Sequence, residues 1–231
     1  MIPRGYYIGK EKKLTRKLYK TLKRFEPELN ARYGNELFAA VQKNAIRHFT
    51  RLIPAIPRYQ AASYQEIILV NAQLVSIIRA MKDAGKSLEE TLQIQATLFK
   101  QEFRRIPRFA GRIFVSSIGR FFLQKLARKV TREGWDTGVV AGGPGDDFDV
   151  SVVTTQCGVV KYLTSEGMTD MLKYCNMSDF LMFPAMNIGL RQTSTIEKGA
   201  CTYCMKYRGS TEMPQSLEAI YERRQSPSSE G

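Results

Sequence analysis

The chain has little of the residues on which several common site chemistries depend. Its 231 residues include one histidine, His48, one tryptophan and four cysteines. A single imidazole excludes a histidine-rich metal site, and any Ser-His-Asp or Cys-His pair would have to use His48. His48 lies in the helical pattern Ala45-Ile-Arg-His-Phe-Thr50, so we expect a solvated or packing role for it.

Long apolar runs are also lacking. No stretch approaches the roughly 18 consecutive apolar residues that a membrane span needs. The first residues, Met1-Ile-Pro-Arg-Gly5, lack the apolar segment of a signal peptide. Cysteines without an export signal indicate reduced thiols rather than a disulfide framework. We therefore expect a cytoplasmic protein with no transmembrane segment.

Acidic residues are scarce in the first half of the chain. Residues 1–132 hold 27 Lys and Arg against nine Asp and Glu, whereas residues 133–231 hold eight against 13. A basic surface of this kind attracts nucleic acid, anionic membrane surfaces or acidic partners. A solvated helical surface rich in Lys and Arg is the simpler interpretation, and the sequence favours it.

The densest basic run is interleaved with aromatic residues. The basic residues are Arg104, Arg105, Arg108, Arg112, Arg120, Lys125, Arg128, Lys129 and Arg132, and the aromatic ones are Phe103, Phe109, Phe114, Phe121 and Phe122. Basic residues with aromatics can bind nucleic acid. Here the aromatics recur at core-facing helical spacing and no nucleic-acid motif accompanies them. We therefore expect them to be buried, and nucleic acid is not favoured as a partner.

Apolar periodicity predicts a helical first half. The expected helices cover residues 11–25, 28–53, 64–81, 87–106 and 111–132. Pro27 is expected to separate the first two helices. Ser87 with Glu90 three residues later is typical of a capping box at the start of the fourth.

The pattern changes near residue 134. An alternating, β-branched run predicts a strand over residues 148–155, and short helices are expected at 158–164, 169–174 and 177–183. Two further strands are expected at 188–196 and 202–208. The sequence therefore predicts an α+β fold, a helical N-terminal half followed by a small α/β unit with a short antiparallel sheet. Its expected parts are a basic helical region at 1–133, a cysteine-containing unit at 134–210, and a short helix with a disordered tail at 211–231.

All four cysteines lie in the second half, at Cys157, Cys175, Cys201 and Cys204. The C-x-x-C spacing of the last two suits a redox pair or half of a zinc site. A second close pair is missing, and on a strand residues 201 and 204 point to opposite faces. We therefore expect no metal site. Each cysteine could also be a small buried apolar residue.

Six elements of the second half follow one another at consistent separations. They are Thr155-Gln-Cys157-Gly, Glu166-Gly167, Tyr174-Cys175-Asn-Met-Ser-Asp179-Phe180, Ile188-Gly189-Leu190, Thr195-Ile196-Glu-Lys-Gly199 and Cys201-Thr-Tyr203. This order resembles the L-2-amino-thiazoline-4-carboxylic acid hydrolase family over residues 134–208, while residues 1–133 are similar only in helical character. Three residues separate Cys175 from Asp179, one more than in the family pattern, and both spacings share a helix face. The final cysteine of the pattern is matched by either Cys201 or Cys204.

The resemblance implies a hydrolase of cysteine metabolism that opens a cyclic amidine (thiazoline) ring toward carbamoyl-cysteine without a cofactor. Asp179, Cys175 and one of Cys201 or Cys204 are the implied catalytic residues. Asp179 would orient water or pair with the amidinium, and a thiolate could be the nucleophile. Cys157 and Arg191 would contact the substrate, with Arg191 binding its carboxylate.

Two other interpretations stay open. The cysteines and Asp179 could line the pocket of a non-catalytic small-molecule or metal-sensing module. Alternatively, residues 1–132 could form a basic scaffold for an acidic partner or a membrane surface. A homo-oligomer is compatible with each of these interpretations.

Overall fold

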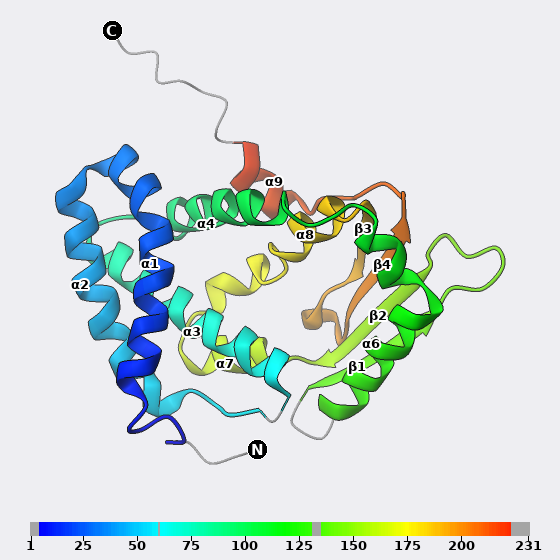
Figure 1. Cartoon of the computed structure of the whole chain (residues 1–231), viewed down its shortest axis with the longest axis horizontal. Helices are drawn as coiled ribbons and strands as arrows, with labels where there is room; N and C mark the ends of the chain where they lie inside the picture. Colours follow the sequence, from blue (N-terminus) through cyan, green and yellow to red (C-terminus); the bar gives the residue numbers. More distant parts are fainter. Residues whose placement is uncertain (1–4, 60, 131–134, 223–231) are drawn as a thin grey trace, which may run out of the picture. The chain divides into compact units, whose positions relative to one another are not determined.

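The structure is a computed structural model that describes residues 5–59, 61–130 and 135–222 (Figure 1). The chain forms two compact units, one of Met1–Leu98 with Val159–Leu172 and one of Phe99–Gly158 with Lys173–Gly231. This division differs from the expected boundary at residue 133, because the chain leaves the first unit after Leu98 and returns to it at Val159. The tail from residue 226, expected to be disordered, lies outside the described residues.

The first unit is helical. It contains α1 (Glu11–Tyr33), α2 (Asn35–Leu52), η1 (Ile53–Ala55), α3 (Ala62–Asp83), most of α4 (Leu88–Phe103) and nearly all of α7 (Gly158–Ser165), and the chain then enters η3 (Thr169–Tyr174). α2 contacts both α1 and α3. The apolar residues that predicted α1 form its buried side, namely Leu14, Leu18, Leu22, Phe25 and Leu29. The helical character expected for the first half is confirmed.

Pro27 does not separate two helices, contrary to the expectation from sequence. It lies inside α1, which continues to Tyr33 and ends at Gly34, where φ is +83°. A proline inside a helix removes one backbone hydrogen bond. Phe25 and Leu29 are nevertheless fully buried on either side of it, and this apolar burial offsets the loss. The break falls instead at the glycine, whose backbone adopts a positive φ without strain.

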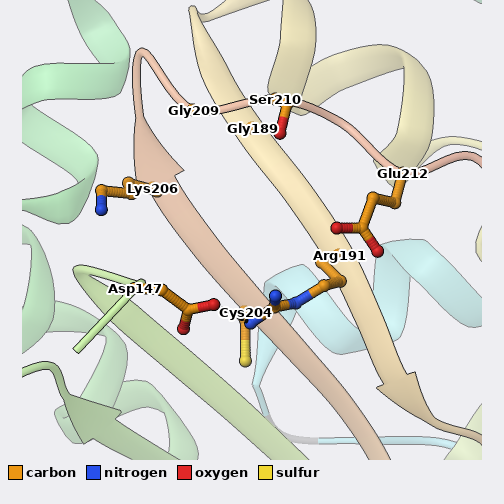
Figure 2. Close-up of a pocket in the computed structure, with 8 residues that line it drawn as sticks. All are labelled: Asp147, Gly189, Arg191, Cys204, Lys206, Gly209, Ser210 and Glu212. Atoms are coloured by element: carbon orange, nitrogen blue, oxygen red, sulfur yellow. Dashed lines mark hydrogen bonds and ion pairs between the residues drawn. The ribbon is translucent and has the colours of Figure 1, made fainter.

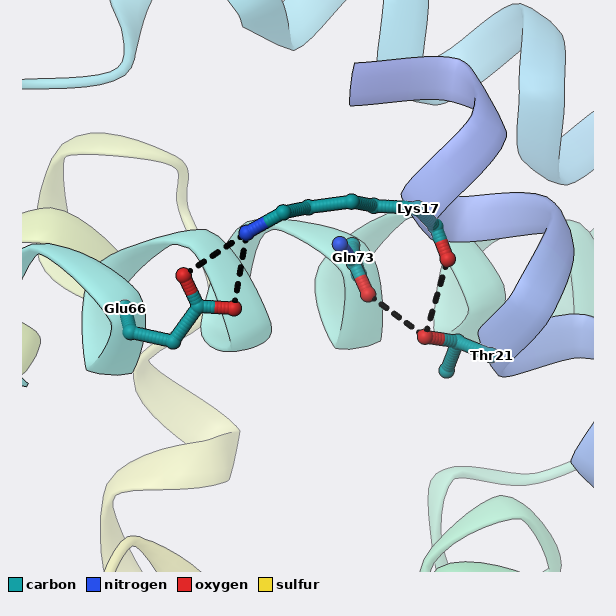
Figure 3. A network of polar contacts seen from close by, with 4 residues as sticks. All are labelled: Lys17, Thr21, Glu66 and Gln73. Carbon is teal, nitrogen blue, oxygen red and sulfur yellow. Dashed lines mark hydrogen bonds and ion pairs between the residues drawn. The ribbon is translucent and has the colours of Figure 1, made fainter. Parts of the chain in front are cut away.

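Polar contacts tie α1 to α3 in the first unit (Figure 3). Lys17 Nζ lies 2.8 Å from Glu66 Oε2, and the Thr21 hydroxyl donates a 2.7 Å hydrogen bond to Gln73 Oε1. Gln73 is 4% exposed, so this bond satisfies an amide that burial would otherwise penalise.

Two further pairs of side chains fix helices of this unit. The capping box is confirmed, because the Ser87 N–H donates to Glu90 Oε2 at 2.7 Å and the Glu90 N–H donates to Ser87 Oγ at 3.1 Å. His48 Nε2 lies 2.8 Å from Asp83 Oδ2 and so links α2 to the end of α3. The histidine therefore has a structural role.

The second unit contains the antiparallel sheet that the sequence predicts. Its strands are β1 (Asp136–Ala141), β2 (Val150–Gln156), β3 (Ile188–Ser194) and β4 (Cys201–Tyr207), in the order β1-β2-β4-β3 with every pairing antiparallel. The α+β class is thereby confirmed. β1 was not expected, because its side chains are mostly exposed and show no buried apolar alternation.

Short helices lie against this sheet. α5 (Ala110–Val115) contacts β4, α6 (Ser117–Val130) contacts β1 and α8 (Asp179–Ala185) contacts β3, while α9 (Gln215–Glu222) is the last element. The single helix expected over residues 111–132 is divided at Ser116, whose ψ of 168° is extended. The Ser116 hydroxyl accepts a hydrogen bond from the Gly119 N–H at 3.3 Å, which caps α6. Residues 131 and 132 lie outside the described part of the chain.

Among the described residues, no helix combines the length and the apolar character that crossing a bilayer requires.

Candidate functional site

Strand β4 separates the two cysteines of the C-x-x-C motif, as the alternation of side chains predicts. Cys201 is paired in register with Thr154 of β2, whereas Cys204 is paired with Ser151 of β2 and Arg191 of β3. Successive residues of a strand point to opposite faces of the sheet. Cys201 therefore shares a face with Tyr203, and Cys204 lies on the other face.

Two of the four thiols, Cys175 and Cys201, lie close to Asp179, and Cys157 lies close to Cys175. Burial raises the pKa of Cys175, Cys201 and Tyr203, and the charge of Asp179 raises each of them further; Cys157 adds to the shift of Cys175. Burial, followed by the charge of Asp179, also raises the pKa of Tyr221 on α9. We call these six residues the Asp179 cluster: Cys157, Cys175, Asp179, Cys201, Tyr203 and Tyr221. All six belong to the second unit.

Asp179 and Cys175 lie close together because a turn connects them, and not because they share one face of a helix. Asp179 is the first residue of α8, and Cys175 lies in the turn that precedes it. The Asp179 N–H donates to the Asn176 carbonyl at 3.0 Å, which closes this turn. The Tyr221 hydroxyl donates to the Met177 carbonyl at 3.1 Å and so fastens α9 to the same turn. The helix-face argument from spacing is therefore wrong, although the two residues do lie close together.

The environment of Asp179 favours its protonated form. The side chain is half-buried, and the dense packing around it raises the pKa of this carboxyl by desolvation from 3.8 to about 7. In the described part of the chain, no side chain forms an ion pair or a hydrogen bond with it, so nothing compensates for the lost hydration. Asp179 therefore changes its charge near neutral pH.

Cys175 and Cys201 are poor thiolates. Burial raises the pKa of Cys175 to about 12, with smaller contributions from Cys157, Cys201 and Asp179. Cys175 still presents surface to solvent. Burial also raises the pKa of Cys201. Hydrogen bonds from Tyr203 and Gln192 lower this pKa, but by less than burial raises it. A thiolate nucleophile is accordingly disfavoured at neutral pH.

A chain of amides orients the Cys201 thiol. Asn176 Nδ2 donates to Gln192 Oε1 at 2.7 Å, and Gln192 Nε2 donates to Cys201 Sγ at 3.3 Å. Asn176 is 6% exposed, and its Oδ1 is buried without a partner among the described residues. Sequence reasoning missed both amides. Gln192 could have been found from its position two residues after Leu190 on a predicted strand.

Arg191 and Cys204 line a separate pocket on the opposite face of the sheet (Figure 2). This pocket, of about 360 Å³, is lined by Asp147, Gly189, Arg191, Cys204, Lys206, Gly209, Ser210 and Glu212. Arg191 forms an ion pair with Asp147, and Figure 2 shows both side chains beside Cys204. The structure therefore does not bring Arg191 or Cys204 together with Asp179.

The described residues contain no group of three His, Cys, Asp or Glu side chains arranged to hold a metal ion. Within the cluster, the raised pKa of Asp179 makes it a group that can accept or donate a proton near neutral pH.

We expect the stability of the second unit to depend on the charge of Asp179. Because the folded-state pKa is raised, the folded chain holds the proton more tightly than the unfolded chain. Stability then falls as pH rises from 3.8, the ordinary value, through about 7. The side chain in the variant Asp179→Asn cannot ionise. Its free energy of unfolding should therefore increase relative to that of the wild type by at most about 1.4 kcal/mol for each pH unit in this range. Denaturant unfolding at several pH values measures the difference.

The exposed carboxylate Glu218 on α9 provides the matched control, Glu218→Gln. This variant should follow the wild type at every pH. Parallel stability curves for Asp179→Asn and the wild type would mean that Asp179 is ordinarily hydrated in the folded chain.

Comparison with protein-family models, with curated proteins and with solved structures finds no match to this chain.

Proposed function

We propose that the chain is a small-molecule hydrolase that opens a cyclic amidine ring, similar to the L-2-amino-thiazoline-4-carboxylic acid hydrolases that the motif order resembles. The observation that carries the proposal is the Asp179 cluster, in which a carboxyl with a raised pKa lies close to the thiols of Cys175 and Cys201 and to two tyrosines. A carboxyl that has no ion-pair partner and whose pKa is raised by desolvation is typical of acid–base catalysis.

In the proposed reaction, Asp179 acts as the general base and then as the general acid. Its carboxylate removes a proton from water as the water oxygen attacks C2 of the 2-amino-thiazoline ring. The tetrahedral intermediate then breaks its bond from C2 to the ring sulfur or to the ring nitrogen. Asp179 returns the proton to the departing atom, and the product is a carbamoyl-cysteine. A pKa of about 7 suits both halves of this cycle, because the group accepts and releases a proton with similar ease.

Cys175 and Cys201 act in their neutral form. With raised pKa values, Cys175 and Cys201 stay protonated at neutral pH. Both lie close to Asp179, and Gln192 donates a hydrogen bond to the sulfur of Cys201. Arg191 and Cys204 take no part in the proposed step, since both face the other side of the sheet. The proposal therefore assigns catalysis to one face of the sheet.

The same thiol chemistry also favours a second candidate, a non-catalytic module that binds or senses a small molecule. Protonated, desolvated thiols are inert, and an unpaired carboxyl could hold a cationic amidinium without hydrolysing it. Turnover distinguishes the two functions, because a sensing module binds the amidine and leaves it intact.

The proposal is tested by incubating the purified chain with 2-amino-thiazoline-4-carboxylate and following carbamoyl-cysteine by mass spectrometry, with and without a chelator. We expect turnover in both conditions, with kcat/KM rising as pH passes through about 7 because Asp179 loses its proton there. The variant Cys204→Ser should keep kcat/KM within about twofold, since its side chain lies on the opposite face. Binding without turnover would favour the sensing module. If the chain neither binds nor hydrolyses the amidine, both candidates are wrong.

A further inference from the structure

An exposed apolar surface covers α5 and α6. The side chains of Phe109, Ile113, Ile118, Phe121 and Phe122 are each between 56% and 65% exposed. Single exposed apolar residues are ordinary, but five exposed apolar side chains within 14 residues are an unusual concentration, and the rings of Phe121 and Phe122 contact each other. The prediction that the aromatics of this run are buried is therefore wrong for Phe109, Phe121 and Phe122.

The exposed residues of α6 lie on one side of the helix. Ile118, Phe122, Lys125 and Lys129 follow one another at spacings of four, three and four residues, so they share a helix face. Each of them is exposed, whereas Ala127 is buried and α6 contacts β1. One side of the helix therefore packs on the sheet, and the other presents apolar residues followed by lysines.

This region carries charge of one sign. Residues 103–130 contain no Asp or Glu, and their eight basic residues are Arg104, Arg105, Arg108, Arg112, Arg120, Lys125, Arg128 and Lys129. All except Arg120 are exposed. We call the five apolar side chains and these seven exposed cations the α5–α6 face. The positive charge of this face favours an anionic partner.

We propose that the α5–α6 face binds the surface of an anionic lipid bilayer. The aromatic and aliphatic side chains enter the boundary between head groups and acyl chains, where apolar area leaves water. Lys125, Arg128, Lys129 and the arginines of residues 104–112 contact anionic head groups. This binding is independent of the function proposed for the Asp179 cluster.

A bilayer fits this face better than other anionic partners do. Nucleic-acid binding surfaces stack bases on aromatic rings, but Ile113 and Ile118 cannot stack and are as exposed as the phenylalanines. A folded acidic protein would have to provide a groove that matches a projecting helix. A bilayer interface adapts to a convex apolar helix face without such a groove.

The test is cosedimentation of the full chain with vesicles of phosphatidylcholine alone and of phosphatidylcholine mixed with phosphatidylglycerol. We expect binding to the anionic vesicles only, and weaker binding at raised salt. Combining Phe121→Ser with Phe122→Ser should lower the partition coefficient by at least about tenfold. Combining Lys125→Glu with Lys129→Glu should lower it by about thirtyfold or more.

Two matched controls use exposed residues of the first unit. Ile67→Ser with Val70→Ser removes two apolar side chains that are 42% and 41% exposed on α3. Lys12→Glu with Lys20→Glu changes the net charge by the same amount on α1. Both controls should bind as the wild type does. The proposal is wrong if the wild type does not bind anionic vesicles, or if the control variants lose as much vesicle binding as the α5–α6 variants do. It is also wrong if the α5–α6 variants lose binding to a single-stranded oligonucleotide instead of to vesicles.

Discussion

Replacing Asp179 with asparagine is expected to lower kcat/KM for ring opening by about 10²–10⁴-fold, the usual contribution of a positioned acid–base group. Asparagine has nearly the same shape as the protonated carboxyl but cannot accept a proton from water. The loss should appear in kcat more than in KM, because the variant still fills the same space beside the substrate. Steady-state kinetics between pH 5 and 9 measure both parameters, and the rise in kcat/KM near pH 7 should disappear.

Two companion variants separate a chemical effect from a structural one. Asp179→Glu keeps a carboxylate, so it should recover part of the lost rate and again show a pH dependence. Cys175→Ser removes a thiol that is protonated at neutral pH, so its effect on kcat/KM should be much smaller than that of Asp179→Asn. If Asp179→Asn opens the ring at the wild-type rate across the pH range, Asp179 is not the acid–base group. If Cys175→Ser is the more damaging change, a thiolate mechanism must replace the one proposed.

The helices and most strands could be predicted because their signals are local. The apolar spacing that defines α1 is carried by residues three and four apart, such as Leu14, Leu18 and Leu22, and these residues are buried as predicted. The Ser87 and Glu90 capping box is equally local. The errors arose where packing outweighed a local rule, as at Pro27, or where a local signal was weak, as in β1.

The candidate site could be predicted only in part, because its geometry depends on contacts between distant segments. Alternation along β4 correctly separates Cys201 from Cys204. The sequence does not reveal which of these two thiols lies near Asp179, since that depends on the strand order and on the turn before α8. Tyr221 joins the cluster from α9, some 40 residues further along the chain, with no local signal that marks it.

The exposure of the α5–α6 face shows the limit of periodicity as a guide to burial. Phe121 and Phe122 follow a helical pattern like that of a core helix, yet both are exposed. Periodicity identifies a common face of the helix but not what covers that face. The absence of acidic residues over residues 103–130 was the additional signal in the sequence, because a solvated helix usually carries charges of both signs.

The second large effect is expected from Phe180→Ala, which should destabilise the second unit by about 3–5 kcal/mol. Phe180 is 1% exposed and follows Asp179 on α8, which packs on β3. Its removal leaves a cavity that the surrounding side chains fill only in part. The fluorescence of Trp135 measures the change, because it is the single tryptophan of the chain and is buried in the same unit.

The variant Phe122→Ala is the matched control for Phe180→Ala, since it deletes the same side chain from a position that is 62% exposed in the same unit. Its stability should change by no more than about 0.5 kcal/mol. Because Phe180 fixes the first turn of α8, Phe180→Ala should also shift the pH dependence of ring opening toward lower pH, as water reaches Asp179 and its pKa falls. Equal destabilisation by the two variants would show that Phe180 is not part of a packed core. A stable Phe180→Ala chain with an unchanged pH profile would show that α8 does not position Asp179.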